Sequence, residues 1–372
     1  MEQTVMEKII EARHTLSALA ERSGEERRTR DFLKTFLREH TSLTVVDCGC
    51  WLYARHDEGA KRTVVVRADH DAVPTACGAR HLCGHDGHTA ALLGLGLLLE
   101  GQRLGCNVIL LFQHAEETGQ GGAACCALFA REGLTRENTR MIGCHNIPGA
   151  PLGRVLFRRG TFACASCGVE ISLTGSPTHA AYPENGVNPT AAVARLALLL
   201  PELADRAARS DGCMALATIV GMRTGERAFG VAASQGVLWA TLRAEKAETF
   251  AALNAAVDQA VRSAAEADGL TCAVERLDVF PATVNDEAMQ DSLERICEEN
   301  GIAHQYLEVP FRWSEDFGHY GSYVPTCFFG IGAGETTPPL HTADYDYPDA
   351  LAPRTAELFW QLLRGLSATG DR

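Results

Sequence analysis

The sequence predicts an α/β fold, a mainly parallel sheet flanked by helices, with a second, smaller α+β domain inserted into it. In the first half of the chain, apolar strands at Val64–Val66 and Val108–Phe112 alternate with helical stretches such as 89–100. This alternation is typical of a parallel sheet with helices on both faces. From about residue 164 the strands instead alternate between apolar and polar residues, as in a sheet with one wet face.

The elements of the inserted region follow a recognisable order. A strand near 169–173 is followed by a helix at 188–203, strands at 214–220 and 237–242, a helix at 248–267 and a strand at 271–279. The order β-α-β-β-α-β matches the ferredoxin-like arrangement. We therefore expect a main domain formed by 1–163 and 280–372 and an inserted domain at 164–279. A length of 372 residues fits two domains.

Composition and charge exclude several classes of protein. The chain is 46% hydrophobic, which is too apolar for a disordered protein, and its net charge of −13 disfavours a nucleic-acid partner. The longest apolar run, ALLGLGLLL, is too short to span a membrane. The N-terminus has no apolar core of a signal peptide, so we expect a cytoplasmic protein with reduced cysteines.

The segment RHLCGHDGH at 80–88 combines one thiol, one carboxylate and three imidazoles within nine residues. Thiolates and neutral imidazoles, here from Cys83 and His85, are good ligands for Zn²⁺ and similar ions. The alternative is a surface loop before a helix, with Asp86 or Thr89 as its N-cap.

Two adjacent carboxylates, Glu116 and Glu117, follow the buried strand at 108–112. Like charges in a dry cleft repel each other unless a cation is present. A metal ion would bind one carboxylate and leave the other to accept a proton from water as a general base. The alternative is a pair of helix N-terminal acids that favour the macrodipole.

Further histidines follow other predicted strands, His145 and His341 in the main domain and His179 in the inserted one. Each alone is more often structural, but the segments combine into five ligands and a base. The ligands are Cys83, His85, Glu117, His145 and His341, with Glu116 as the base. Five ligands suit two divalent ions about 3.5–4 Å apart, because one catalytic zinc usually takes only three from protein.

These motifs resemble the co-catalytic metallopeptidase family of aminoacylases, carboxypeptidases and auxin-conjugate hydrolases. The resemblance is strongest to its amidohydrolase branch, which includes hippurate hydrolases and N-acyl-amino-acid deacetylases. The matching stretches occur in family order from about residue 67 to 349: RADHDAVP, HLCGHDGHTAALLG, FQHAEE, GCHNIP, GSPTHAAYP, FPATVND, SEDFGHY and PPLHTADYDYPD.

The resemblance implies a phosphorylase/hydrolase-like catalytic domain, a lid and dimerisation domain, and a homodimer. It implies that Cys83 bridges two divalent ions (Zn, Mn, Co or Ni) and that Glu116 activates water. Asp71 matches an acid that orients the site, and His179 matches a histidine that the family lends across the dimer interface to stabilise an oxyanion.

The sequence departs from the family at two places. The segment after His14 lacks the usual Pro-Glu, and Gly230 stands where an asparagine usually holds substrate. Arg243 is therefore our candidate for binding the substrate carboxylate, although a surface arginine on a strand is nearly as common.

We expect a metal-dependent hydrolase of N-acyl amino acids or related small amides. One alternative is a dipeptidase or a deacetylase of the N-acetyl-diaminopimelate type. Alternatives from other classes are a non-catalytic metal- or metabolite-binding protein on the same scaffold, and an enzyme that uses Cys83 as a thiol nucleophile.

Overall fold

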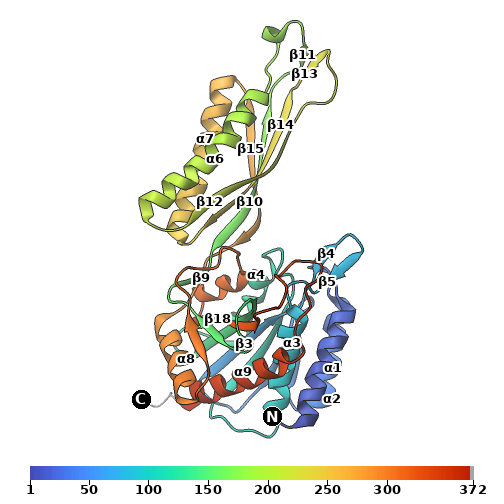
Figure 1. The fold of residues 1–372 in the computed structure, drawn as a ribbon, viewed down its shortest axis with the longest axis vertical. Helices are drawn as coiled ribbons and strands as arrows, with labels where there is room; N and C mark the ends of the chain where they lie inside the picture. Colours follow the sequence, from blue (N-terminus) through green and yellow to red (C-terminus); the bar gives the residue numbers. More distant parts are fainter. Residues whose placement is uncertain (369–372) are drawn as a thin grey trace. The chain divides into compact units, whose positions relative to one another are not determined.

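The computed structural model describes residues 1–368, which form two compact units (Figure 1). The larger unit comprises Met1–Phe162, Thr283–Val309 and the chain from Asp316 onward. The smaller unit comprises Ala163–Ala282 together with Pro310–Glu315. We predicted from the sequence that 310–315 belongs to the main domain. This short segment has no strand or helix pattern that would link it to the inserted domain.

The larger unit is built on an eight-stranded mixed sheet. Its spatial order is β1 (Thr44–Asp47), β2 (Leu52–His56), β6 (Asn107–Gln113), β3 (Thr63–Asp69), β7 (Thr139–Pro148), β18 (Thr326–Gly334), β8 (Val155–Phe157) and β17 (His304–Tyr306). The four central strands β6, β3, β7 and β18 run parallel to one another. Every residue of β3 is buried, as expected of a strand covered on both faces.

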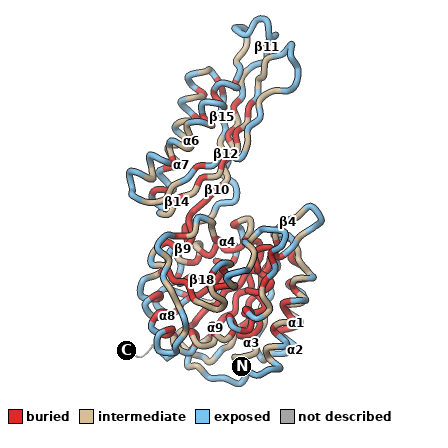
Figure 2. The backbone as a smooth tube through the Cα atoms, viewed as in Figure 1, coloured by how far each residue is buried: buried red, intermediate tan, exposed pale blue. Residues whose placement is uncertain are grey.

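Helices surround this sheet, and the predicted fold class is confirmed (Figure 1). They are α1 (Gln3–Leu19), α2 (Arg27–His40), α3 (His85–Leu98), α4 (Gly121–Cys125), α5 (Ala127–Glu132), α8 (Glu287–Glu299) and α9 (Leu351–Ala368), with a 3-10 turn η2 (Asp316–Ser322). The apolar run ALLGLGLLL lies in α3 and continues one residue beyond it, and this helix is buried along nearly its whole length (Figure 2). No helix among residues 1–368 is long and apolar enough to cross a membrane.

The smaller unit is a four-stranded antiparallel sheet with two helices and a separate apolar core. In chain order it contains β10 (Ala165–Thr174), α6 (Thr190–Asp211), β12 (Ala215–Thr224), β14 (Gln235–Ala244), α7 (Ala247–Asp268) and β15 (Thr271–Phe280). This is the predicted β-α-β-β-α-β order, and the spatial order is β12-β14-β10-β15. A short ribbon of β11 (Thr178–His179) and β13 (Val231–Ala232) extends from it.

Short pairs of strands and one turn complete the fold. These are β4 (Val73–Thr75) with β5 (Gly78–Arg80), β9 (Thr161–Ala163) with β16 (Thr283–Val284), and the 3-10 turn η1 (Pro183–Asn185). All 14 cysteines lie within the described residues and are free thiols.

Candidate metal centre

The parallel strands bring three polar segments to one edge of the sheet. Asp69 at the end of β3 pairs with Gln113 at the end of β6, and Arg67 pairs with Gly143 of β7. The segments that follow β3 and β6 therefore leave the sheet level with His145 of β7. Ligands of open α/β sheets bind beyond these carboxyl ends, which is where the sequence predicted the site.

Cys83 is the point at which the predicted ligands meet. Its Sγ lies 3.4 Å from Nε2 of His145 and 3.2 Å from Nε2 of His341. Nε2 of His341 lies 3.5 Å from Oε1 of Glu117, which is 3.9 Å from Nε2 of His85. Two sets of potential ligand atoms, each within 4.8 Å of one another, share the thiol. One is Cys83, His85 and His145, and the other is Cys83, Glu117 and His341.

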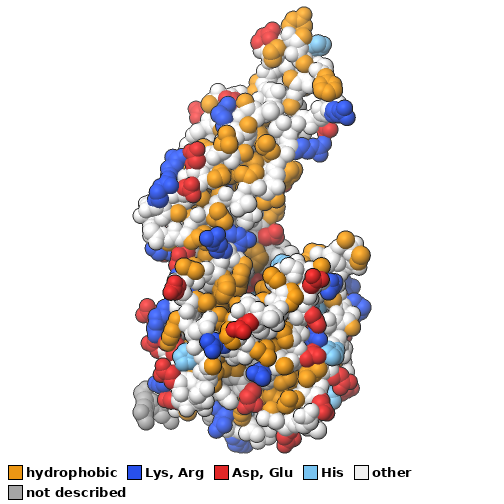
Figure 3. Space-filling model, in the orientation of Figure 1, with side chains coloured by type: hydrophobic (Ala, Val, Ile, Leu, Met, Phe, Trp, Pro, Cys, Tyr) orange, Lys and Arg blue, Asp and Glu red, His pale blue; other side chains and the backbone are white. Residues whose placement is uncertain are grey.

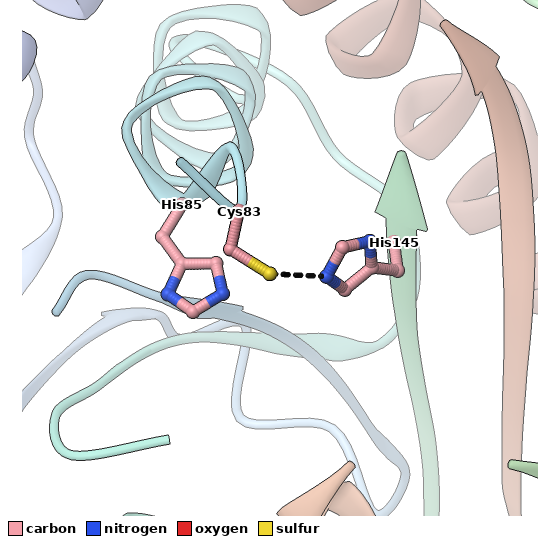
Figure 4. Close-up of side chains that lie close together, drawn as sticks. All are labelled: Cys83, His85 and His145. Atoms are coloured by element: carbon pink, nitrogen blue, oxygen red, sulfur yellow. Dashed lines mark hydrogen bonds between the residues drawn. The ribbon is translucent and has the colours of Figure 1, made fainter. Parts of the chain in front are cut away.

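Local structure explains why these side chains converge. Gly84 has φ of +93°, and a Cβ there would lie 2.5 Å from Oδ1 of Asn146, so only glycine fits between Cys83 and the start of α3. Figure 4 shows Cys83 just before α3, His85 in its first turn and His145 on β7 pointing toward a common centre. His341 has φ of +62°, an uncommon backbone conformation of the kind found at functional sites.

The residues present fit a pair of divalent cations. Nε2 of His85 and Oε1 of Glu117 are buried and have no hydrogen-bond partner among residues 1–368, which is costly unless a cation binds them. Burial and the neighbouring His88 hold the pKa of His145 well below its usual range, so this imidazole is neutral and able to bind a metal. Burial and Glu117 raise the pKa of the Cys83 thiol, so a nearby cation is needed to stabilise the thiolate.

Glu116 lies beside this cluster. Its carboxylate is nearly buried, and its Oε2 lies 4.0 Å from Nε2 of His85. The backbone N–H of Asp316, at the start of η2, donates a hydrogen bond of 3.3 Å to its Oε1. Glu116 therefore lies next to Glu117 but outside the two groups of potential ligands that share Cys83. This is the position expected of a general base beside a metal pair.

Asp71 contacts both metal-binding segments. Its Oδ1 lies 3.2 Å from Nδ1 of His85, and its Oδ2 accepts hydrogen bonds from the N–H of Glu117 at 3.0 Å and the hydroxyl of Ser23 at 2.7 Å. Burial alone would raise its pKa, but these contacts hold the pKa of Asp71 well below its usual range. The resulting carboxylate fixes the orientation of the His85 ring.

A network of buried polar side chains, not predicted from the sequence, lies behind the predicted ligands. Arg67 donates to Asp69 at 2.8 Å and to Asp316 at 2.9 Å, and Asp69 lies 2.7 Å from Nδ1 of His88. The other nitrogen of His88 lies 2.6 Å from Oδ1 of Asn146. Arg67, Asp69 and Asp71 alternate in RADHD and so share one side of the chain, which is the signal that could have grouped them.

The other two predicted site residues, His179 and Arg243, belong to the smaller unit, as does Gly230. His179 is exposed on β11, and Gly230 precedes β13, where a Cβ would meet no atom within 4 Å. Arg243 donates to the carbonyl of Arg312 at 2.9 Å and to the hydroxyl of Ser314 at 3.1 Å. It lies near the end of β14, about 27 Å from Gln235 at the start of that strand.

Comparison with known proteins agrees with this geometry. The model of the peptidase family M20/M25/M40 matches residues 65–364, most of the chain. The chain belongs to this family. It is therefore a metal-dependent amidohydrolase or peptidase, and the family and enzyme class expected from the sequence are confirmed.

Several curated members of the M20 family resemble this chain along most of its length. A probable hydrolase of Synechocystis is 27% identical, covering 94% of this chain and 93% of the relative. The IAA-amino acid hydrolase ILR1-like 4 of Arabidopsis thaliana is 27% identical over 79% and 71%. The N-acetyl-L-cysteine deacetylase of Bacillus subtilis is 28% identical over 88% and 81%.

Solved structures share the fold of this M20 family member. A putative aminohydrolase from methicillin-resistant Staphylococcus aureus has a TM-score of 0.87 at 22% identity, covering 97% of each chain. A dinuclear metal-binding peptidase of the M20 family from Bacillus subtilis has a TM-score of 0.83 at 21% identity, covering 99% of this chain and all of that one.

Proposed function

We propose that this M20 family member hydrolyses the amide bond of N-acyl amino acids or related small amides, releasing a carboxylic acid and an amino acid. The observation that carries the proposal is the pair of ligand groups that share Cys83, with Glu116 beside them. Relatives named as an IAA-amino acid hydrolase and an N-acetyl-L-cysteine deacetylase support this class of substrate.

Two divalent ions would be held by five side chains of the larger unit. We assign the ligand roles to Cys83, His85, Glu117, His145 and His341. When bound, such ions lower the pKa of a water molecule and polarise the substrate carbonyl. A mixed set of sulfur, nitrogen and oxygen ligands suits Zn, Mn, Co and Ni.

Glu116 moves the proton in this mechanism. Its carboxylate accepts a proton from the attacking water and delivers it to the leaving nitrogen, so the amine departs neutral. The N–H of Asp316 holds one oxygen of Glu116, which leaves the other directed toward the cluster. Asp71 maintains the alignment of His85 and of the Glu117 backbone while the proton moves.

The smaller unit supplies substrate contacts in this proposal. Arg243 would bind the free carboxylate of the amino acid, and His179 would donate to the developing oxyanion. His179 is exposed on a ribbon that precedes β14, far from Arg243 at the opposite end of that strand. We propose, as the family resemblance implies, that His179 acts in the site of a partner chain while Arg243 acts in a different part of the substrate site.

We propose a homodimer formed through the smaller unit, the predicted lid and dimerisation domain. Strand β12 is at an edge of its sheet and exposes apolar side chains, including Val220 and Met222. Apolar side chains on an unpaired edge favour pairing with another chain. Analytical ultracentrifugation should give about twice the chain mass of 40.1 kDa, and a species of one chain mass at micromolar concentration would contradict the dimer.

A second candidate substrate class has specific support. An N-acetyldiaminopimelate deacetylase of Exiguobacterium sibiricum is 27% identical over 90% of this chain and 93% of its own. Gly230 leaves open space where an asparagine usually holds substrate, which favours an unusual substrate. The net charge of −13, and the mixed acidic and basic side chains in Figure 3, support a small-molecule substrate over nucleic acid. We also propose a cytoplasmic location.

The test is a panel of N-acyl amino acids, dipeptides and N-acetyl-diaminopimelate, assayed with metal-reconstituted protein. We expect hydrolysis that stops on chelation and returns with Mn²⁺, Zn²⁺ or Co²⁺. Glu116→Gln should lower kcat by about 10²–10⁴-fold while the bound metal is kept, and the exposed acid variant Glu137→Gln should match the wild type. Full turnover by metal-free protein, or a covalent acyl adduct on Cys83, would refute the mechanism.

A further inference from the structure

The residue that precedes the proposed base has a strained backbone. Ala115 has φ of +48°, in the left-handed region that residues with a side chain rarely adopt. This conformation costs about 1–2 kcal/mol and persists only where surrounding contacts hold it. Because Ala115 lies between β6 and Glu116, its conformation sets the direction in which Glu116 and Glu117 leave the sheet.

Glu26 holds this turn from a distant part of the chain. Its Oε1 accepts a hydrogen bond of 2.8 Å from the N–H of Ala115, across 89 positions of sequence. Inside the turn, the carbonyl of Ala115 accepts hydrogen bonds from the N–H of Gly121 at 3.1 Å and of Gln120 at 3.3 Å. The turn is so tight that a Cβ on Gly121 would lie 1.6 Å from the carbonyl oxygen of His114. Glu26 therefore adds a hydrogen bond from a distant segment to a turn that is already held by its own backbone hydrogen bonds.

Burying a carboxylate at position 26 is expected to destabilise the fold. Glu26 directly precedes α2 and is only 4% exposed. Among residues 1–368 no basic side chain forms an ion pair with it, and Asp71 adds a second negative charge nearby. A buried charge without a partner is destabilising, so stability alone would favour an apolar residue. The carboxyl group accepts hydrogen bonds from the N–H groups of Gly24, of Glu26 itself and of Ala115, and only the last joins it to the turn before Glu116.

We propose that Glu26 is a positioning residue for catalysis, which keeps the turn at Ala115 in the conformation that presents Glu116 and Glu117 side by side. It touches neither substrate nor metal in this account, and it acts through the backbone. The inference rests on the proposed function, because it requires Glu116 to be the base.

Three variants separate this role from general stability. Glu26→Ala removes the acceptor, Glu26→Gln keeps an oxygen acceptor without the charge, and Glu21→Ala is the matched control. Glu21 accepts from the N–H groups of Arg28 at 3.2 Å and Thr29 at 2.8 Å, so it stabilises the same start of α2 without touching Ala115.

We expect Glu26→Ala to lower kcat by about 10–100-fold, since a misplacement of about 1 Å has effects of this size. KM should change by less than about threefold, because no substrate contact is lost. Glu26→Gln should restore kcat to within about threefold of the wild type, and Glu21→Ala should keep the wild-type kcat. If Glu26→Ala does not fold, Glu26→Met fills a similar volume without an acceptor and receives the same measurements.

Hydrogen exchange of the metal-free protein, followed by mass spectrometry, gives a readout independent of activity. The peptide covering 114–121 should exchange faster in Glu26→Ala than in the wild type, Glu26→Gln or Glu21→Ala. Unchanged exchange or unchanged kcat in Glu26→Ala would overturn the inference, as would a kcat in Glu26→Gln as low as in Glu26→Ala. A wild type that is inactive on every substrate would refute the proposed function instead, and the exchange data would still test the contact.

Discussion

At the scale of single residues, the site concentrates acids that the protein must keep in defined charge states. Asp71 stays charged because three hydrogen bonds offset its burial. Glu26 is the opposite case, because burial raises its pKa to about 7 even though backbone N–H groups, including that of Ala115, oppose the shift. Two buried carboxyl groups with different pKa values thus lie near one cluster.

The raised pKa of Glu26 predicts how stability depends on pH. Between the ordinary value of 4.5 and about 7, Glu26 of the folded metal-free protein keeps a proton that it has lost in the unfolded chain, so the contribution of Glu26 to the free energy of unfolding falls as pH rises. Glu26→Gln removes this penalty and should gain up to about 3 kcal/mol relative to the wild type between pH 5 and pH 8. Urea unfolding at the two pH values measures this gain, and an equal difference at both would contradict the prediction.

At the scale of elements, α3 presents His85 and His88 from its first turn, and its position depends on close packing. The ring of Tyr347, which is buried, lies against Gly87, where a Cβ would be 2.3 Å from the ring atoms. Further along the same helix, a Cβ on Gly96 would make only ordinary contacts, the nearest at 3.4 Å. The two glycines therefore have different roles in one helix.

Alanine substitutions distinguish these two roles. Gly87→Ala should destabilise the fold by about 1–3 kcal/mol through overpacking, and it should weaken metal binding because the start of α3 must shift. Gly96→Ala should be neutral or stabilising by up to about 1 kcal/mol, since alanine is the better helix former. Chemical unfolding and metal titration of both variants check this, and equal behaviour of the two would show that the contact with Tyr347 is unimportant.

At the scale of the whole molecule, the fold class and the β-α-β-β-α-β order were predictable. Hydrophobic periodicity indicates which segments are strands and which are helices, and their order along the chain follows from it. The sequence also grouped Cys83, His85, Glu117, His145 and His341, which the structure brings together in two sets that share Cys83, because each strand-end segment is rich in ligand-type residues. The contacts of Arg67 with Asp316 and of Glu26 with Ala115 were not predictable. They join residues 249 and 89 positions apart, and nothing in local spacing selects those partners among many acids.

The number of metal ions bound per chain shows whether two ions share the thiolate of Cys83. Elemental analysis of the reconstituted wild type should give two divalent ions, and Cys83→Ala should lose at least one because both ligand groups use this thiol. Cys272→Ala, which removes an exposed thiol of the smaller unit, should keep both. A wild type that binds fewer than two ions, or a Cys83→Ala protein that still binds two with wild-type affinity, would contradict the shared-thiolate site.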